Sequence, residues 1–277
     1  ADRWLASLLE EGSISYLYYA NRLVQFPHGV LSLAVATAAF PVFSDEAASE
    51  AEGAIRRTLV DAGRLILLIT LPAAFGLIAL ADPIMEVLFE RGAFGPAETA
   101  ASAWALRAYS LGLIAFGGVR LLAGVYHARQ NTRYPVRCAN MAVLANLVLS
   151  VALMFPLKFV GLALATSAAS FLNLGLLIRG MREVEGDWPA GDLVSALKRI
   201  APLSLSMGAG VYLLNTAIWP AGSSFAVRGG ALCAEIALAA VFYLGLCRVF
   251  APMEAAPLFA VLRRRLGNWG RAEGKNE

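Results

Sequence analysis

Long uncharged apolar blocks, separated by short charged segments, are the feature that most constrains how this chain folds. A block of about 18 or more apolar residues can cross the hydrocarbon core of a bilayer as an α-helix. In lipid, only helices and closed barrels satisfy every backbone amide and carbonyl. The blocks lack the alternation of apolar and polar residues that marks a barrel strand. The sequence therefore predicts an all-α fold, a polytopic bundle of transmembrane helices.

Seven complete spans are expected, after the tail of a preceding helix at residues 1–10. They run at about 20–43, 59–81, 100–125, 135–155, 159–179, 201–219 and 229–250. Their connections are short: a tight turn at 156–158, an amphipathic piece at 84–94, and a second one at 191–200 in the loop 180–200. Because ADRWLASLL at the start reads as the end of a helix, we expect a fragment of a longer protein.

Basic residues concentrate on one side of this arrangement. They gather in or beside the segments 44–57, 126–134, 180–200 and 251–277. The positive-inside rule places such segments in the cytoplasm, so we expect a cytoplasmic C-terminus. Although the net charge is +3, the basic residues sit at segment ends and form no single patch, so no nucleic-acid partner is expected.

Charged groups inside a span are the first candidates for function, because each costs at least a few kcal/mol in lipid. Arg22, Arg107 and Arg120 fall in predicted spans. Asn21 and Gln25 flank Arg22 and share one helical face, since they are one turn apart. Beside an aqueous cavity an arginine binds phosphate or carboxylate in a bidentate way. The alternative is that Arg22 snorkels to the membrane interface.

Other polar residues inside the spans allow two readings each. His28, as a lone histidine, fits a packed polar residue better than a proton relay. Glu235, the only acid well inside the last span, is expected to pair with Arg228 or to face a groove. Asn146 and Ser150 are one turn apart and suit either a cation ligand pair or hydrogen bonding between helices. No phosphate-binding loop, HExxH or GxSxG motif is present, so an enzyme is not expected.

Several long motifs occur together in a distinctive order: GSISYLYYANRLVQFPHGVLSLAVATAAFPVFS, LFERGAF, YSLGLIAFGGVRLLAGVYHARQNTRYPVR and GLALATSAASFLNLGLLIRGMRE. In these the chain resembles the MurJ (MviN) lipid II flippases of the multidrug/oligosaccharidyl-lipid/polysaccharide exporter superfamily. The resemblance implies that residues 1–182 form the C-terminal lobe, from the end of the seventh span to the twelfth. Residues 183–250 would be a loop and two additional transmembrane helices, and 251–277 a basic cytoplasmic tail.

The resemblance also implies a function. Such proteins flip lipid II, the undecaprenyl-pyrophosphate-linked muropeptide of peptidoglycan biosynthesis, across the bacterial cytoplasmic (inner) membrane by alternating access. Arginines of a cationic cavity bind the pyrophosphate, and the two additional helices form a groove for the polyprenyl tail. The partners would be lipid II, membrane lipids and the N-terminal half of the same transporter.

The family motif identifies candidate site residues. Arg22 matches the arginine of the family's A-[DN]-R-L motif and becomes the main substrate contact, with Asn21, Gln25 and Arg120 as further substrate-binding candidates. Family members often have Asp at position 21 and Glu at position 25, and both are neutral here. No catalytic residue and no cofactor other than Na⁺ is expected. The candidate Na⁺ ligands, by resemblance, are Asp2, Asn146, Ser150, Leu162 and Thr166, with Ser150 standing where the family has an acid.

Two other functions stay open at this point. One is export of other lipid-linked oligosaccharides or of drugs, as in relatives within the same superfamily. The other is a non-transporting membrane scaffold, which would not require arginines inside spans. Drug exporters tend to place acids in the cavity, whereas the charges inside these spans are mainly arginines. The pattern therefore favours an anionic substrate.

Overall fold

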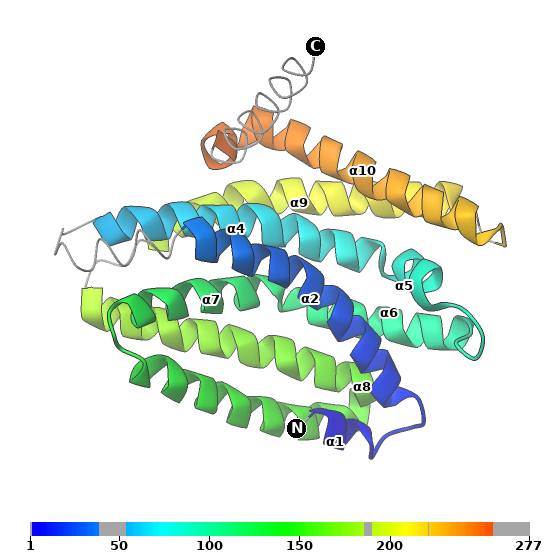
Figure 1. Cartoon of the computed structure of the whole chain (residues 1–277), viewed down its shortest axis with the longest axis horizontal. Coiled ribbons are helices and arrows are strands. Elements are labelled where there is room, and N and C mark those ends of the chain that lie inside the picture. The colour runs from blue at the N-terminus through cyan, green and yellow to red at the C-terminus, as the bar shows by residue number, and fades with distance from the viewer. Residues whose placement is uncertain (1, 39–53, 186–189, 221, 257–277) are drawn as a thin grey trace, which may run out of the picture.

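The computed structural model describes residues 2–38, 54–185, 190–220 and 222–256. Every regular element among these residues is an α-helix (Figure 1), which confirms the all-α prediction. In chain order the helices are α1 (Asp2–Ala6), α2 (Ser13–Ala38), α4 (Ala54–Ala79), α5 (Ala81–Phe89), α6 (Pro96–Leu111), α7 (Leu113–Ala128), α8 (Arg133–Glu185), α9 (Ala190–Ile218) and α10 (Phe225–Phe250). Most of the predicted loop 44–57 and tail 251–277 lies outside the described residues.

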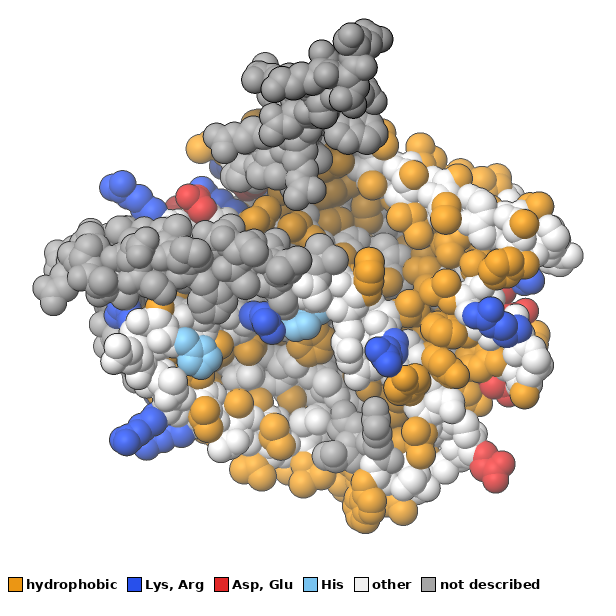
Figure 2. Space-filling view, viewed as in Figure 1, with side chains coloured by type: hydrophobic (Ala, Val, Ile, Leu, Met, Phe, Trp, Pro, Cys, Tyr) orange, Lys and Arg blue, Asp and Glu red, His pale blue; other side chains and the backbone are white. Residues whose placement is uncertain are grey.

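Large apolar side chains cover much of the outer surface, as the orange areas of Figure 2 show. Val148 and Phe155 on α8 and Val241 on α10 are 68%, 79% and 69% exposed. Apolar area on this scale is unfavourable in water and matches a lipid environment. Within the described residues, five segments are long and apolar enough to cross a bilayer: Arg56–Ala79, Pro96–Ala128, Arg133–Arg182, Ala190–Ile218 and Phe225–Phe250. The chain is therefore a multi-pass membrane protein, while the count of seven spans stays a prediction.

The helix α8 holds two of the predicted spans, 135–155 in its first arm and 159–179 in its second arm. The two arms are folded back on each other (Figure 1). The helix breaks at Lys158, whose φ of 49° and ψ of −133° are not helical. The arms come so close that a Cβ added at Gly161 would lie 2.3 Å from the carbonyl oxygen of Leu153. Glycine therefore permits the close approach, and the tight turn predicted at 156–158 is confirmed.

Two other boundaries differ from the prediction. The span expected at 100–125 is divided into α6 and α7, which meet at Gly112. The second arm of α8 packs on this junction, where the Ser167 hydroxyl donates to the Ala108 carbonyl at 2.7 Å. The run 191–200, expected in a loop, instead begins α9. The apolar face of this run is buried, with Ala196 and Ile200 at 1% and 0% exposure. Because this packing stabilises the helical conformation, the helix begins before the expected span.

The helices form one bundle with a peripheral hairpin. The α2 helix crosses α4, α6 and α7, and α4 packs along α9 (Figure 1). The α9–α10 pair lies on the α4–α5 side, away from α8. This arrangement leaves one face of α2 and the first arm of α8 open toward each other, and the candidate site lies there.

Candidate functional site

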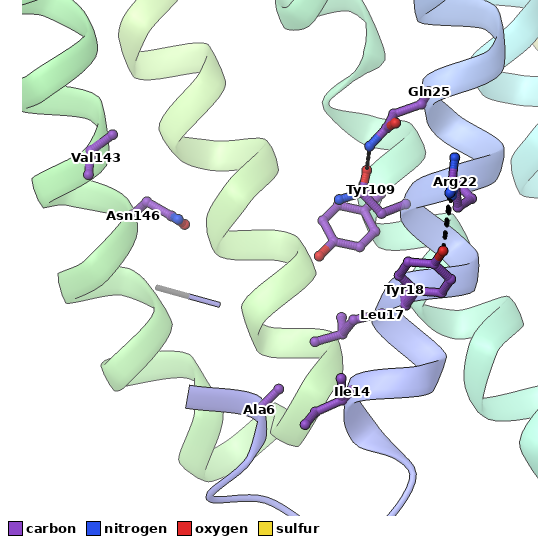
Figure 3. A pocket seen from close by; sticks show the side chains of 10 residues that line it. Ala6, Ile14, Leu17, Tyr18, Arg22, Gln25, Tyr109, Val143 and Asn146 are labelled. Carbon is purple, nitrogen blue, oxygen red and sulfur yellow. Dashed lines mark hydrogen bonds between the residues drawn. The ribbon is translucent and has the colours of Figure 1, made fainter. Parts of the chain in front are cut away.

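A cavity of about 580 Å³ opens between α2 and the first arm of α8 (Figure 3). The α1 and α6 helices contribute one side chain each. Its lining residues are Ala6, Ile14, Leu17, Tyr18, Asn21, Arg22, Gln25, Tyr109, Val143 and Asn146. No acidic side chain is among these lining residues, so the cavity carries a positive charge from Arg22.

The Arg22 side chain contacts Tyr18 of the same helix, and its positive charge is still available to bind a ligand. Its Nε and Nη2 atoms donate to the Tyr18 hydroxyl at 3.3 and 3.2 Å (Figure 3). The guanidinium carbon lies 5.5 Å from the centroid of the Tyr18 ring. Among the described residues no carboxylate pairs with Arg22. Because guanidinium has five N–H donors and these two bonds go to a neutral oxygen, Arg22 can still bind an oxyanion.

Asn21 and Gln25 form the neutral part of the same wall. Gln25 Nε2 donates to Asn21 Oδ1 at 2.9 Å, which confirms that the two residues share a helical face. Both side chains are exposed and line the cavity. Their remaining amide atoms can donate to or accept from hydroxyl and amide groups of a ligand.

The other two intramembrane arginines lie elsewhere. Arg107 donates to the Asp82 carboxylate and to the Ile78 carbonyl, and lies 4.9 Å from the Trp104 ring centroid. It is therefore bound within the protein and is a structural residue. Arg120 lines a second cavity, of about 490 Å³, together with His28. Of the four predicted substrate residues, the structure thus brings Asn21, Arg22 and Gln25 together and places Arg120 apart.

The candidate Na⁺ ligands form two pairs, one on each arm of α8. The Ser150 hydroxyl donates to Asn146 Oδ1 at 3.4 Å, and the Thr166 hydroxyl donates to the Leu162 carbonyl at 3.1 Å. Asp2 begins α1, but its side chain lies outside the described structure. The oxygens suit a hard cation chemically, since carbonyl and hydroxyl oxygens keep lone pairs beside these bonds. Asp2 would supply the only carboxylate of the set.

Glu235 differs from both expectations. The residue is 3% exposed, so it faces no groove. Asn215 Nδ2 donates to its two oxygens at 3.3 and 3.0 Å, within the α9–α10 hairpin. Arg228, the expected partner, instead pairs with Glu86 of α5 at 2.5 Å. The prediction was wrong because the α9–α10 hairpin places Asn215 opposite Glu235 and the start of α10 against α5.

With this arrangement established, the family model described as "Lipid II flippase MurJ" matches residues 1–228. The chain belongs to the MurJ family. A probable MurJ of Vibrio cholerae is 39% identical over 180 residues, which cover 65% of this chain and 34% of that protein. A probable MurJ of Haemophilus influenzae is 34% identical over 250 residues, covering 87% of this chain and 49% of the relative.

A solved structure of MurJ in an inward closed conformation has the same fold. It superposes with a TM-score of 0.73 at 27% identity, covering 92% of this chain and 50% of that one. The chain thus spans about half the length of the MurJ proteins it matches. This agrees with the interpretation of the chain as the C-terminal half of a MurJ transporter.

Proposed function

We propose that this chain is the C-terminal half of a flippase that moves lipid II across the bacterial cytoplasmic membrane by alternating access. The N-terminal half of the same transporter would complete the cavity. The observation that carries the proposal is Arg22, a guanidinium without a carboxylate partner among the described residues, in a cavity whose described lining contains no acid. A charge kept in this state inside a membrane domain is typical of a substrate pathway.

In this proposal each residue of the wall has a distinct task. Arg22 binds the pyrophosphate, because its planar donors match phosphate oxygens in a bidentate way. Tyr18 holds the guanidinium from one side and so limits its rotamers. Asn21 and Gln25 hydrogen-bond to the polar sugar and peptide groups of the headgroup. No catalytic group is needed, since no covalent bond changes.

The site disfavours two of the three alternative functions. A cationic drug would meet a positive wall, so drug export is the weaker reading. Another lipid-linked oligosaccharide with a pyrophosphate linkage would satisfy the same residues. A scaffold without transport would give Arg22 no role.

The test measures lipid II at the outer leaflet of cells in which the full-length protein is depleted and replaced by variants. We expect depletion to lower outer-leaflet lipid II, and Arg22→Ala to restore it at least about tenfold less efficiently, because a lost charge-assisted bond is worth about 1.5–3 kcal/mol. Arg91→Ala is the matched control, since Arg91 is exposed and lies outside the cavity. Unchanged lipid II after depletion would refute the flippase proposal.

We also propose that Na⁺ binds between the arms of α8 and couples to transport. The supporting observation is the two oxygen pairs, Asn146 with Ser150 and Leu162 with Thr166. Replacing Ser150 by Asp adds a carboxylate at the position where the resemblance to the family implies an acid. We expect this variant to bind Na⁺ more tightly, measured as Na⁺-dependent thermal stabilisation of the purified transporter with K⁺ as control. Identical melting curves in Na⁺ and K⁺ for both proteins would rule out the site.

A further inference from the structure

The LFERGAF motif, residues 88–94, has no role in the proposed function. It spans the end of α5 and the turn that leads to α6. In this turn Gly92 has a φ of 62°, a left-handed conformation that a side chain disfavours, and the Phe94 N–H donates to the Arg91 carbonyl at 3.1 Å. The chain is thereby folded back, so the ring centroids of Phe89 and Phe94 lie 6.4 Å apart.

Both rings of the motif contact Tyr19 of α2. The Tyr19 ring centroid lies 4.5 Å from that of Phe89 and 5.5 Å from that of Phe94, to which it is perpendicular. Tyr19 directly follows Tyr18, whose hydroxyl accepts from Arg22, and the two tyrosine ring centroids are 5.5 Å apart. The aromatic cluster of Tyr19, Phe89 and Phe94 therefore joins the end of α5 to the wall of the first cavity.

Glu86 connects the same short helix to the α9–α10 hairpin. Its carboxylate accepts from Arg228 Nη1 at 2.5 Å and from Trp219 Nε1 at 3.0 Å. Glu90 of the motif lies 3.8 Å from the same guanidinium. Because α5 is one continuous helix, a displacement of the Phe89 ring also displaces Glu86, three residues earlier. The start of α10, which holds Arg228, therefore follows the position of α5.

We propose that the segment 88–94 is a coupling element, which transmits the position of the cavity wall at Arg22 to the start of α10. Tyr19 is a positioning residue: it is not among the residues that line the first cavity and acts through Tyr18 and Phe89. A ligand that binds Arg22 changes the contact of its guanidinium with Tyr18, and the aromatic cluster passes this change to α5. Because such coupling is reciprocal, a displaced hairpin also changes the affinity for that ligand.

This role in transport rests on the proposed flippase function. The mechanical connection from α2 through α5 to α10 does not depend on it.

The test follows the reactivity of a buried cysteine on α10, in a cysteine-free background of the full-length transporter in detergent. Leu232 is 6% exposed and lies one turn beyond Arg228 on the same helical face, so Leu232→Cys reports whether the start of α10 leaves the bundle. The parent protein carries this cysteine alone. We expect Tyr19→Ala to accelerate its labelling by a maleimide about two- to tenfold, the factor that loss of an aromatic pair gives. Tyr19→Phe should label at the parent rate, because the ring of Tyr19 makes the contacts with the motif.

Tyr16→Ala is the matched control. Tyr16 lies on the same helix, and its ring packs edge-on against Phe159 of α8 with centroids 5.3 Å apart, so this change removes an aromatic pair between α2 and α8. An unchanged labelling rate in Tyr19→Ala, or an equal increase in Tyr16→Ala, would overturn the coupling. Thermal unfolding verifies that each variant is folded, and Ala239→Cys, a smaller change at a buried position of α10, is the second reporter.

Lipid II separates this inference from the proposed function. With lipid II bound, as measured on the same sample, we expect the labelling rate to change in the parent protein and to stay constant in Tyr19→Ala. Bound lipid II without a change in the parent, or with the same change in both proteins, would overturn the transmission. If lipid II does not bind, or depletion leaves outer-leaflet lipid II unchanged, the flippase proposal fails, and the labelling rates without ligand decide the coupling.

Discussion

Four arginines of the described structure differ in whether a carboxylate compensates their charge. Arg199 pairs with Glu254 at 3.0 Å and Arg228 pairs with Glu86 at 2.5 Å, so a carboxylate neutralises each of these charges. Arg22 and Arg120 have no carboxylate partner among the described residues and each lines a cavity. Since an uncompensated charge inside a membrane domain is costly, these two arginines are the candidates for a functional role.

Lys158 illustrates strain at a single residue. Its φ of 49° and ψ of −133° lie in a region that suits glycine, and a lysine there costs about 1–3 kcal/mol. Its ion pair with Glu10 offsets little, because the two side chains are 57% and 70% exposed. We expect Lys158→Gly to stabilise the transporter by about 1 kcal/mol, measured by thermal unfolding of the purified protein.

The control for this prediction separates the strain from the ion pair. Lys158→Ala removes the same contact with Glu10 but keeps a Cβ in the strained conformation. It should therefore unfold at or below the wild-type temperature. If the glycine variant were no more stable than the alanine variant, the strain at this position would be disproved.

Part of the site could be predicted from the spacing of individual residues. The pairing of Asn21 with Gln25 followed from their spacing of one helical turn. The contact of Tyr18 with Arg22 has the same spacing and was missed, although the sequence contained that signal. Tyr109 reaches the first cavity from another helix, and no local pattern reports such a contact.

Polar contacts at several positions along its length attach the α9–α10 hairpin to the rest of the bundle. Arg228 pairs with Glu86 at one end, where Trp219 Nε1 also donates to Glu86 at 3.0 Å. Along the hairpin, the Tyr243 hydroxyl donates to the carbonyl of Leu68 on α4 at 2.9 Å. Because these bonds are distributed along the hairpin, we expect it to move together with α4 and α5.

Removal of one anchor tests this interpretation. Arg228 and Glu86 are 19% and 20% exposed, so Arg228→Ala would leave a mostly buried carboxylate without its cation. We expect it to destabilise the transporter by roughly 2–3 kcal/mol, at or below the low end of the range for fully buried pairs, because both side chains keep some solvent contact. Thermal unfolding of Arg228→Ala, Glu86→Gln and the double variant measures the coupling. Arg248→Ala, at an exposed position of the same helix, is the control, and additive effects of the two changes would refute a direct coupling.

The positions of the spans could be predicted from the sequence, but the junctions between helices could not. Apolar length alone predicts that a segment crosses lipid, and the described helices overlap each expected span. The break at Gly112 depends on Ser167 of another helix, so it was not visible in the 100–125 segment. The early start of α9, before the expected span, likewise depends on the packing of Ala196 and Ile200 inside the bundle.

The whole molecule is electrostatically asymmetric from end to end. The start of α4, the α7–α8 loop and the start of α9 lie at the same end of the molecule (Figure 1). These segments are rich in arginine and lysine. There Arg56, Arg57 and Arg64 line a pocket with Asp61 and Asp192. The opposite end, with α5 and the α9–α10 turn, carries acids that pair with the few cations present.

This asymmetry predicts the orientation in the membrane. The positive-inside rule assigns the basic end to the cytoplasm, and α10 ends on that side. In a cysteine-free background of the full-length transporter, we expect Ser224→Cys in the α9–α10 turn to react with a membrane-impermeant maleimide in intact cells. Asn131→Cys in the α7–α8 loop should react only after the membrane is permeabilised. Both positions are exposed, so a difference in labelling reports the side of the membrane, and the reverse pattern would invert the assignment.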